Sequence, residues 1–256
     1  MIVLLDYGNW VRKKILFILG LCALVAGALI FIPLGLVYKF FTTLLFLIAF
    51  VSFLFPLYAY IMFSQNGGKL QEKIYNLAIQ HLGINLQGEF IDIGSGNGVL
   101  AVTLAKKHET IRVTGVDYWG ADWEYSKSVC EKNAQIVEVE NRVHFQKGDA
   151  ASLDFADQTF DGAISNLTFH EVKSVPDKKL VFQEALRVVK PGGSFSFVDY
   201  FFDEKYYGTA LVLEKFLKDM NLENYERKHL QDVITLPAML RHPKILGKVG
   251  IIFGRK

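Results

Sequence analysis

Two long uncharged segments near the N-terminus constrain this chain more than any other feature of its sequence. No charged residue occurs at positions 15–38, and none occurs at positions 40–68. A helix needs roughly 20 apolar residues to cross the hydrocarbon core of a bilayer. We therefore expect two transmembrane helices, at about 15–37 and 40–63, joined by a tight turn around residues 33–40. The lipid bilayer is then a partner of the whole 15–63 segment.

Basic residues flank both uncharged segments. Arg12, Lys13 and Lys14 precede the first, and Lys69 and Lys73 follow the second. Two spans place both ends of the chain on one side, and the positive-inside tendency makes that side the cytoplasm. The sequence predicts an integral membrane protein whose polar domain is cytoplasmic.

Two other readings of the apolar region are weaker. The small residues at 26–28 resemble a signal-peptide cleavage site, but the first segment is long for a signal peptide and a second follows at once. Two buried helices of a soluble core would each carry a polar face, and these segments have none. We therefore divide the chain into a membrane anchor, residues 1–65, and a polar domain, residues 66–256.

Bulk composition excludes some functions for the polar domain. The net charge of +2 is too small for a nucleic-acid binder, and we expect none as a partner. The two cysteines do not form a disulfide framework, and the histidines and cysteines lack metal-ligand spacing, so we predict no metal.

The polar domain alternates short apolar strands with helical segments, which is typical of a doubly wound, mostly parallel α/β sheet. Lys190–Gly193 reads as a turn before the fifth strand. The expected strands are 89–93, 112–116, 143–147, 160–165, 195–199 and a closing strand at 249–253, and the expected helices are 69–82, 99–107, about 122–136, 177–189 and 205–220.

A glycine-rich turn follows the first strand. Glycines stand at 94, 96 and 98, so the G-x-G-x-x-G dinucleotide fingerprint is not met. Asp92 precedes them, and its carboxylate would repel a pyrophosphate at close range, whereas it suits a cationic ligand. Both points disfavour a NAD-dependent oxidoreductase.

The stretch Phe90–Gly98 resembles the first motif of the class I S-adenosylmethionine-dependent methyltransferases. The resemblance implies their seven-stranded Rossmann-like fold and S-adenosylmethionine as cofactor, with the glycine loop and Asp92 at its amino-acid part. Gly115–Asp117 resembles the second motif, whose acid accepts the ribose hydroxyls, and Gly148–Ala150 resembles the segment that faces the adenine. Lys190–Phe195 resembles the turn before strand five. The cofactor-binding residues expected on this basis are Asp92, Gly94, Ser95, Gly96, Asn97, Gly98, Asp117, Tyr118, Trp119, Gly148, Asp149, Ala150 and Asn166.

Three of these positions keep a second reading. Asp117 could cap a turn, although it ends a strand where a ribose acceptor is needed. Asp149 could equally be a turn residue. Trp119 could stack on the adenine or cover the following helix. The aromatic residues after Asp117 depart from the commoner family pattern, which places a small polar residue there.

The reacting region should follow strand four, because ligands of open α/β sheets lie beyond the carboxyl ends of the strands. Residues 165–172 lack the paired prolines of many methyltransferases that act on nitrogen and look closer to small-molecule methyltransferases. His170 is the candidate general base or positioning residue, and simple packing is its other reading. A sulfonium is already activated, so no base is required. Asp199 and Tyr200 are second candidates on the substrate side.

The sequence thus predicts methyl transfer from S-adenosylmethionine to a small, lipophilic or membrane-associated acceptor. The alternatives are a membrane-anchored protein methyltransferase, a NAD-dependent oxidoreductase on a related fold, and a scaffold without catalytic activity.

Overall fold

The computed structural model describes residues 5–84, 86–120 and 124–256 of the chain. Its contacts define two compact units: one is Gly8–Glu72, and the other joins Met1–Tyr7 to Lys73–Lys256. The first unit, here called the hairpin unit, is therefore enclosed in sequence by two segments of the second, the α/β unit. The predicted domain boundary between residues 65 and 66 lies near the end of the hairpin unit and stays a prediction.

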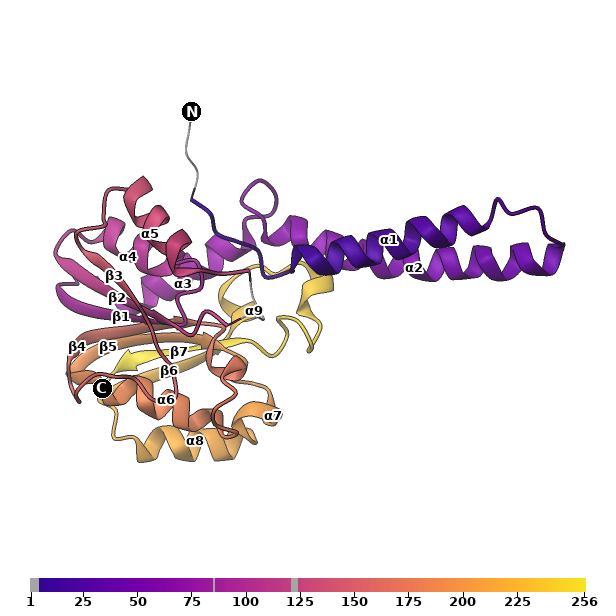
Figure 1. Cartoon of the computed structure of the whole chain (residues 1–256). Coiled ribbons are helices and arrows are strands. Elements are labelled where there is room, and N and C mark those ends of the chain that lie inside the picture. Colours follow the sequence, from indigo (N-terminus) through magenta and orange to yellow (C-terminus); the bar gives the residue numbers. More distant parts are fainter. Residues whose placement is uncertain (1–4, 85, 121–123) are drawn as a thin grey trace. The chain divides into compact units, whose positions relative to one another are not determined.

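Two apolar helices, α1 (Lys13–Leu29) and α2 (Leu36–Phe63), form an antiparallel pair in the hairpin unit (Figure 1). Small residues let the two backbones approach closely. A Cβ added to Gly20 would lie 3.4 Å from the Phe53 ring, and Gly27 makes a similar contact with α2. Close packing through glycine and alanine is typical of helices that associate in lipid.

The lengths of the two helices differ from those predicted. Among the described residues only α2, with 28 residues and a mean hydropathy of 2.4, is long and apolar enough to cross a membrane. Helix α1 has 17 residues, which at 1.5 Å per residue gives about 26 Å, short of the roughly 30 Å of hydrocarbon. The prediction of a first span at 15–37 is therefore wrong in extent. Pro33 disfavours helix in the residue before it, so the chain leaves α1 at Ile30 and enters α2 at Leu36.

The α/β unit contains one seven-stranded sheet in the order β3-β2-β1-β4-β5-β7-β6. The first five strands in this order are parallel, and β7 runs antiparallel to both neighbours. This confirms the predicted mostly parallel sheet. The strands are β1 (Gly88–Ile93), β2 (Ile111–Asp117), β3 (Val143–Lys147), β4 (Phe160–Asn166), β5 (Val189–Asp199), β6 (Asn224–His229) and β7 (Gly250–Arg255).

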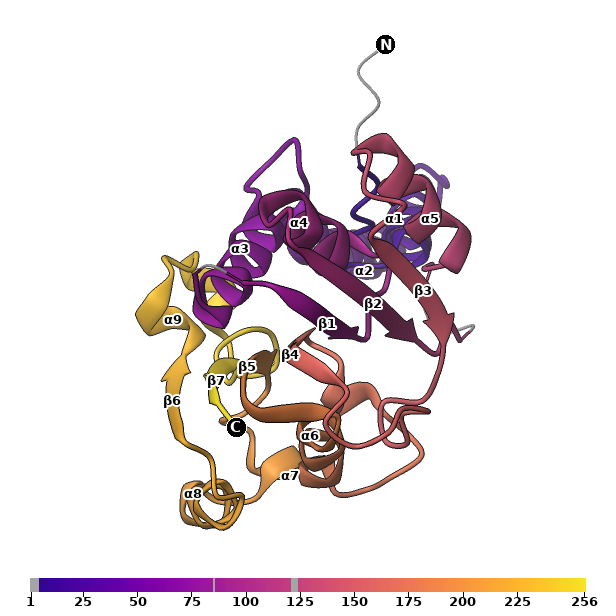
Figure 2. The same cartoon turned by 90° about the vertical axis from the view of Figure 1, so that its left-hand side faces the viewer.

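Helices cover both faces of the sheet. Helices α3, α4 and α5 lie on one face, and α6, α7 and α8 lie on the other (Figure 2). The helices are α3 (Leu70–Leu82), α4 (Val99–Lys107), α5 (Lys127–Ile136), α6 (Lys178–Arg187), α7 (Glu204–Tyr207), α8 (Ala210–Asp219) and α9 (Leu230–Val233), with two short 3-10 helices, η1 (Phe169–Glu171) and η2 (Ala238–Arg241).

Several boundaries differ from the sequence prediction for local reasons. The single helix predicted at 205–220 is two helices, because Gly208 has φ 74° and Thr209 then caps α8 through its hydroxyl. Strand β5 begins at Val189, so the predicted turn at Lys190–Gly193 lies within an irregular start of the strand. Strand β6 was not predicted. The predicted start of α5 near residue 122 lies outside the described residues, and α5 begins at Lys127.

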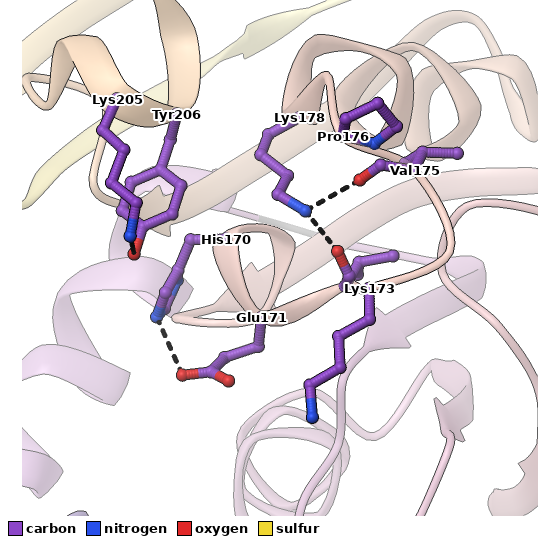
Figure 3. Close-up of a pocket in the computed structure, with 9 residues that line it drawn as sticks. His170, Glu171, Lys173, Val175, Pro176, Lys178, Lys205 and Tyr206 are labelled. Atoms are coloured by element: carbon purple, nitrogen blue, oxygen red, sulfur yellow. Dashed lines mark hydrogen bonds and ion pairs between the residues drawn. The ribbon is translucent and has the colours of Figure 1, made fainter.

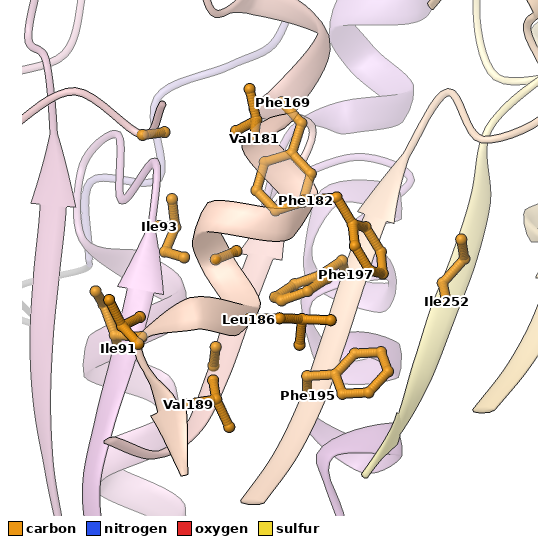
Figure 4. Close-up of a cluster of buried hydrophobic side chains, with 14 of the residues drawn as sticks. Ile91, Ile93, Phe169, Val181, Phe182, Leu186, Val189, Phe195, Phe197 and Ile252 are labelled. Carbon is orange, nitrogen blue, oxygen red and sulfur yellow. The ribbon is translucent and has the colours of Figure 1, made fainter. Parts of the chain in front are cut away.

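An aromatic core joins α6 to the sheet (Figure 4). Phe182 of α6 packs edge-on against Phe195, Phe197 and Phe169, with ring centroids 5.3–6.3 Å apart. Such edge-to-face pairs add to the free energy gained by burying the rings. The core fixes η1, which contains Phe169, against β5, and so positions the residues that follow β4.

The parallel strands bring several polar residues to one edge of the sheet. Asp92 lies near the carboxyl end of β1, Asp117 ends β2, Asn166 ends β4 and Asp199 ends β5. Ligands of open α/β sheets bind at this edge. The fold therefore places the candidate site there.

Candidate functional site

The glycine turn between β1 and α4 forms a tight loop in a backbone conformation that favours glycine. Gly94, Gly96 and Gly98 all have positive φ, at 81°, 57° and 74°. A Cβ on Gly94 would lie 1.9 Å from the Thr168 hydroxyl, and one on Gly98 would lie 2.7 Å from the Phe145 ring. At its three glycines the loop exposes backbone without a side chain, at the start of α4, where N–H groups can meet a ligand.

Asp92 is a fully buried carboxylate beneath this loop. Its Oδ2 accepts a hydrogen bond from the Ala101 N–H at 3.2 Å, and Ser95 donates its hydroxyl to the Asp92 carbonyl. Burial raises the pKa of Asp92 to about 7, and nearby Asp117 adds to the effect. Within the described part of the chain, Oδ1 of Asp92 has no hydrogen-bond partner. A buried acceptor of this kind is stabilised by a cationic donor.

Asp117 lies where the second motif predicts it, at the carboxyl end of β2. Its two oxygens accept hydrogen bonds from the backbone N–H groups of Gly96 at 2.8 Å and Trp119 at 2.7 Å. Burial raises its pKa, and these hydrogen bonds oppose the rise. A carboxylate has about four lone-pair positions, so Asp117 can still accept from a ribose hydroxyl.

Trp119 is hydrogen-bonded to the glycine loop. Its indole Nε1 donates to the Gly96 carbonyl at 2.8 Å, and its backbone has φ 42°, an unusual value for a residue with a side chain. Tyr118 beside it is 64% exposed, with the Lys147 ammonium 5.0 Å from the ring centroid. Stacking of either ring on adenine stays a prediction.

The segment after β3 lies beside Asp117. The Gly148 N–H donates to the Asp117 carbonyl at 3.0 Å, and Ala150 is buried. Asp149 accepts a hydrogen bond from the Ala151 N–H at 2.9 Å, so its side chain closes its own turn. One of its oxygens is thus already in use, and its contact with adenine stays a prediction.

Two amides complete the cofactor side. Asn97 in the glycine loop and Asn166 at the end of β4 are both buried. In the described residues their Oδ1 atoms, like Oδ1 of Asp92, accept no hydrogen bond. The loop and the first turn after β4 meet at Thr168, whose hydroxyl lies 3.5 Å from the Gly94 carbonyl and 3.2 Å from the Asn166 carbonyl. The structure therefore brings these sequence-predicted residues to one place.

His170 and Asp199 form a buried pair on the substrate side. The His170 Nδ1 lies 3.0 Å from an Asp199 oxygen, and its Nε2 lies 3.4 Å from Glu171. Burial opposes protonation of the ring, but the charge of Asp199 and the contact with Glu171 outweigh it and raise the His170 pKa to about 9. Asp199 also accepts the Tyr200 N–H at 2.6 Å. This pair joins the ends of β4 and β5 and holds an imidazolium at neutral pH.

The sequence did not reveal a polar relay behind the glycine loop. Asn133 on α5 donates to the carbonyls of Asn97 at 2.9 Å and Asp6 at 3.0 Å, and its own oxygen accepts the Asp6 N–H. Asn133 thus links the N-terminal segment, residues 5–7, to the glycine loop. Asn133 lies on the buried face of α5 with Cys130 and Ala134, and its partner 127 residues away was not predictable from the sequence.

The chemistry of this site fits S-adenosylmethionine. Its amino-acid part carries an ammonium with three N–H donors, which matches the buried oxygens of Asp92, Asn97 and Asn166. Its ribose carries vicinal hydroxyls, which match Asp117 at the next strand end. The glycine loop leaves room for close approach of the chain to the ligand.

Comparison with known proteins supports this fit. Residues 91–197 match the family model described as a methyltransferase domain. O-methyltransferase rstn1 of Aspergillus nomiae is 29% identical over 113 residues, which are 44% of this chain and 47% of that protein. The 27-O-demethylrifamycin SV methyltransferase of Amycolatopsis mediterranei is 31% identical over 110 residues, 43% of this chain and 38% of that protein. The chain thus spans less than half the length of these relatives.

A solved structure shares the fold. Geranyl diphosphate C-methyltransferase from Streptomyces coelicolor, solved with Mg²⁺, geranyl diphosphate and S-adenosyl-L-homocysteine, superposes with a TM-score of 0.54 at 15% identity. The superposition covers 74% of this chain and 80% of that chain. The α/β unit therefore has the fold of the methyltransferases, and its residues 91–197 match their domain.

Proposed function

We propose that this protein transfers a methyl group from S-adenosylmethionine to a small-molecule acceptor. The observation that carries the proposal is the unpartnered, buried Asp92 oxygen under a glycine loop whose next strand ends in Asp117. The domain match over residues 91–197 supports it, as does the S-adenosyl-L-homocysteine named with the solved relative.

When bound, the cofactor supplies a methyl group on a positively charged sulfur. The chain's part is to orient and enclose it. Asp92 and Asn97 would hold the ammonium and Asp117 would hold the ribose, and the hydrogen bond from Asn133 to the Asn97 carbonyl keeps the loop in place. Alignment of the acceptor with the methyl group and exclusion of water supply much of the rate enhancement in such a reaction.

His170 fits a positioning role better than that of a general base. With a pKa of about 9, only about 1% of the imidazole is neutral at pH 7. The protonated ring, fixed by Asp199, can hold an acceptor oxygen near the methyl group if that oxygen replaces Glu171, which lies 3.4 Å from Nε2, as the partner of the Nε2 N–H. The general-base role predicted from the sequence needs a neutral imidazole, which becomes common only as the pH approaches 9. That role stays a prediction.

The hairpin unit is proposed to bind the bilayer. Most of the exposed side chains of its helices α1 and α2 are apolar, which is favourable in lipid and unfavourable in water. The basic residues at its two ends support a cytoplasmic α/β unit. The exposed side chains include Phe17, Leu24, Phe31, Leu36, Val37, Phe40, Phe41, Ile48 and Val51.

A membrane location would bring the active site to lipophilic acceptors, which motivates the further proposal of a membrane-associated acceptor. Its alternative is a membrane protein as the acceptor. Incubation of the purified protein with tritiated S-adenosylmethionine, and then with extracted lipids or membrane proteins, separates the two. Label in protein but in no lipid fraction would contradict the lipophilic acceptor.

The cofactor proposal is tested by calorimetric titration of S-adenosylmethionine into the full chain in phosphatidylcholine nanodiscs. We expect micromolar binding that weakens by about tenfold or more in Asp117→Ala, because hydrogen bonding to the ribose is lost. Asp219→Ala, at the exposed end of α8, is the control and should bind normally. A folded wild-type protein that does not bind S-adenosylmethionine would contradict the proposal.

The membrane topology is tested by cysteine labelling in intact membrane vesicles. Lys39→Cys lies in the first turn of α2 and Lys256→Cys lies at the C-terminus. Two crossings predict that a membrane-impermeant maleimide reaches the two positions from opposite sides. Labelling of both from the same side would mean that α1 and α2 enter the bilayer without crossing it.

A further inference from the structure

A pocket of about 460 Å³ lies beside the His170–Asp199 pair. It is formed by η1, the loop that leads to α6, the first turn of α6, and α7 (Figure 3). Its volume lies in the range of small-molecule sites. Since it lies at the carboxyl ends of β4 and β5, it is where the fold would place an acceptor.

Two lysines from different helices flank His170 in this pocket. Lys178 is the first residue of α6, and Lys205 belongs to α7; Figure 3 shows them on either side of the imidazole. The Lys178 side chain is buried, and its ammonium donates to the carbonyls of Val172 and Val175. An ammonium has three donors, so a third remains for a ligand.

The charges of the two lysines are not balanced locally. Burial lowers the pKa of Lys178, and the positive charge of Lys205 lowers it further, against the opposing effect of Asp199 and Glu171. Within the described part of the chain, no ion pair joins Lys178 or Lys205 to a carboxylate, whereas both acids contact His170. A partly buried cation without a counter-ion is stabilised when an anion binds.

The pocket is also lined by the charged side chains of Glu171 and Lys173 and by apolar groups. Val175 and Pro176 lie behind Lys178, and the ring of Tyr206 lies beside Lys205 (Figure 3). The Lys205 ammonium is 4.7 Å from the centroid of that ring. A ligand that fills the pocket therefore meets lysine ammonium groups and apolar groups, while the Glu171 carboxylate in the same pocket is in contact with His170.

We propose that the methyl acceptor is a small amphipathic anion. Its anionic oxygens bind between Lys178 and Lys205, its apolar body lies on Val175, Pro176 and Tyr206, and its reacting atom lies near His170. The assignment as acceptor rests on the proposed methyl transfer. The binding of an anion does not rest on the proposed methyl transfer, because it depends only on the residues of the pocket.

The test uses the full chain in nanodiscs of phosphatidylcholine, which carries no net charge. Hexanoate and hexyl phosphate are titrated as probes, and hexanol, which keeps the apolar body without the charge, is the ligand control. We expect at least one anion to bind and hexanol not to bind. The tighter of the two probes identifies a carboxylate or a phosphate acceptor, and competition by phosphatidic acid in the discs would identify a lipid headgroup as the source of the phosphate.

Variants identify the site. Lys205→Gln should weaken binding of the preferred probe by about tenfold, the loss expected for one charge-assisted hydrogen bond. Lys205→Arg should retain it, and Lys215→Gln, an exposed lysine on α8, should not change it. Lys205 is exposed, so its replacement is compatible with folding.

Two results would overturn the proposal: anions that bind no better than hexanol, or equal binding by the Lys205→Gln variant. S-adenosylmethionine is titrated into the same samples to keep the two proposals distinct. Cofactor binding without anion binding contradicts the anionic acceptor alone. Anion binding without cofactor binding supports the pocket and contradicts the methyl transfer.

Discussion

Replacement of Asp199 by asparagine tests the electrostatics of the site most directly. The carboxylate lies 3.0 Å from His170 Nδ1, and the contacts of the ring raise its pKa from 6.5 to about 9. At about 1.4 kcal/mol per pKa unit, this difference corresponds to about 3 kcal/mol in favour of the imidazolium in the folded protein. In Asp199→Asn the burial remains while the main opposing charge is gone, so we expect the His170 pKa to fall to 6.5 or below.

The same shift predicts the direction of a pH effect on stability. A raised pKa in the folded state means that the contribution is fully present below pH 6.5 and is lost as the pH rises through about 9. The free energy of unfolding of the wild-type protein should therefore fall by up to about 3 kcal/mol across this window. In Asp199→Asn this dependence should be absent.

Two measurements check this prediction. Histidine-labelled protein in detergent gives the pKa of His170 by NMR titration, with the signal assigned from a His170→Asn sample. Urea unfolding at the two ends of the pH window gives the stability. Asp219→Asn, the same chemical change at an exposed site, is the control. A His170 pKa that stays near 9 in Asp199→Asn would refute the assigned cause.

Three further predictions concern the loop, the relay and the core. Gly94→Ala places a Cβ 1.9 Å from a threonine hydroxyl at positive φ and should weaken S-adenosylmethionine binding by about tenfold or more. Gly192→Ala, also at positive φ but with nothing within 4 Å, should leave calorimetric binding unchanged. Asn133→Ala should destabilise the protein by about 1–3 kcal/mol and speed hydrogen exchange at Asp6, and unchanged exchange there would contradict the relay. Phe182→Ala should cost about 3–5 kcal/mol in chemical unfolding, and a loss under about 1 kcal/mol would mean that the core can refill the space.

The sequence predicted where the residues around the glycine loop lie because their geometry is local. Strand, glycine turn and helix are contiguous, so the positions of Asp92 and Gly94 follow from one short motif. Asp117 follows from the end of the next strand, since parallel strands end at the same edge of a sheet. His170 and Asp199 follow in the same way, although their 3.0 Å contact needed the structure.

What the sequence could not predict depends on distant partners or on backbone choices that composition does not set. Asn133 matters because Asp6 lies against it, and no periodicity connects α5 with the N-terminal segment. The sequence allows Gly208 to lie inside a helix. In the structure its positive φ ends α7 and separates it from α8, and Lys205 lies on the short helix α7. Apolar composition predicted α1 as long as α2, but the turn before Pro33 ends it early.

The order of the two units along the chain makes the hairpin unit an insertion rather than an N-terminal extension. Residues 5–7 belong to the α/β unit, and the rings of Tyr7 and Tyr75, on the two flanks of the insertion, lie 6.1 Å apart. Domain insertions of this kind can be removed when their ends lie close together. A water-soluble form of the α/β unit should therefore be obtained by joining Tyr7 to Lys73 through a short glycine–serine linker, whereas a truncation that begins after the hairpin would also discard the segment that contacts Asn133 behind the glycine loop.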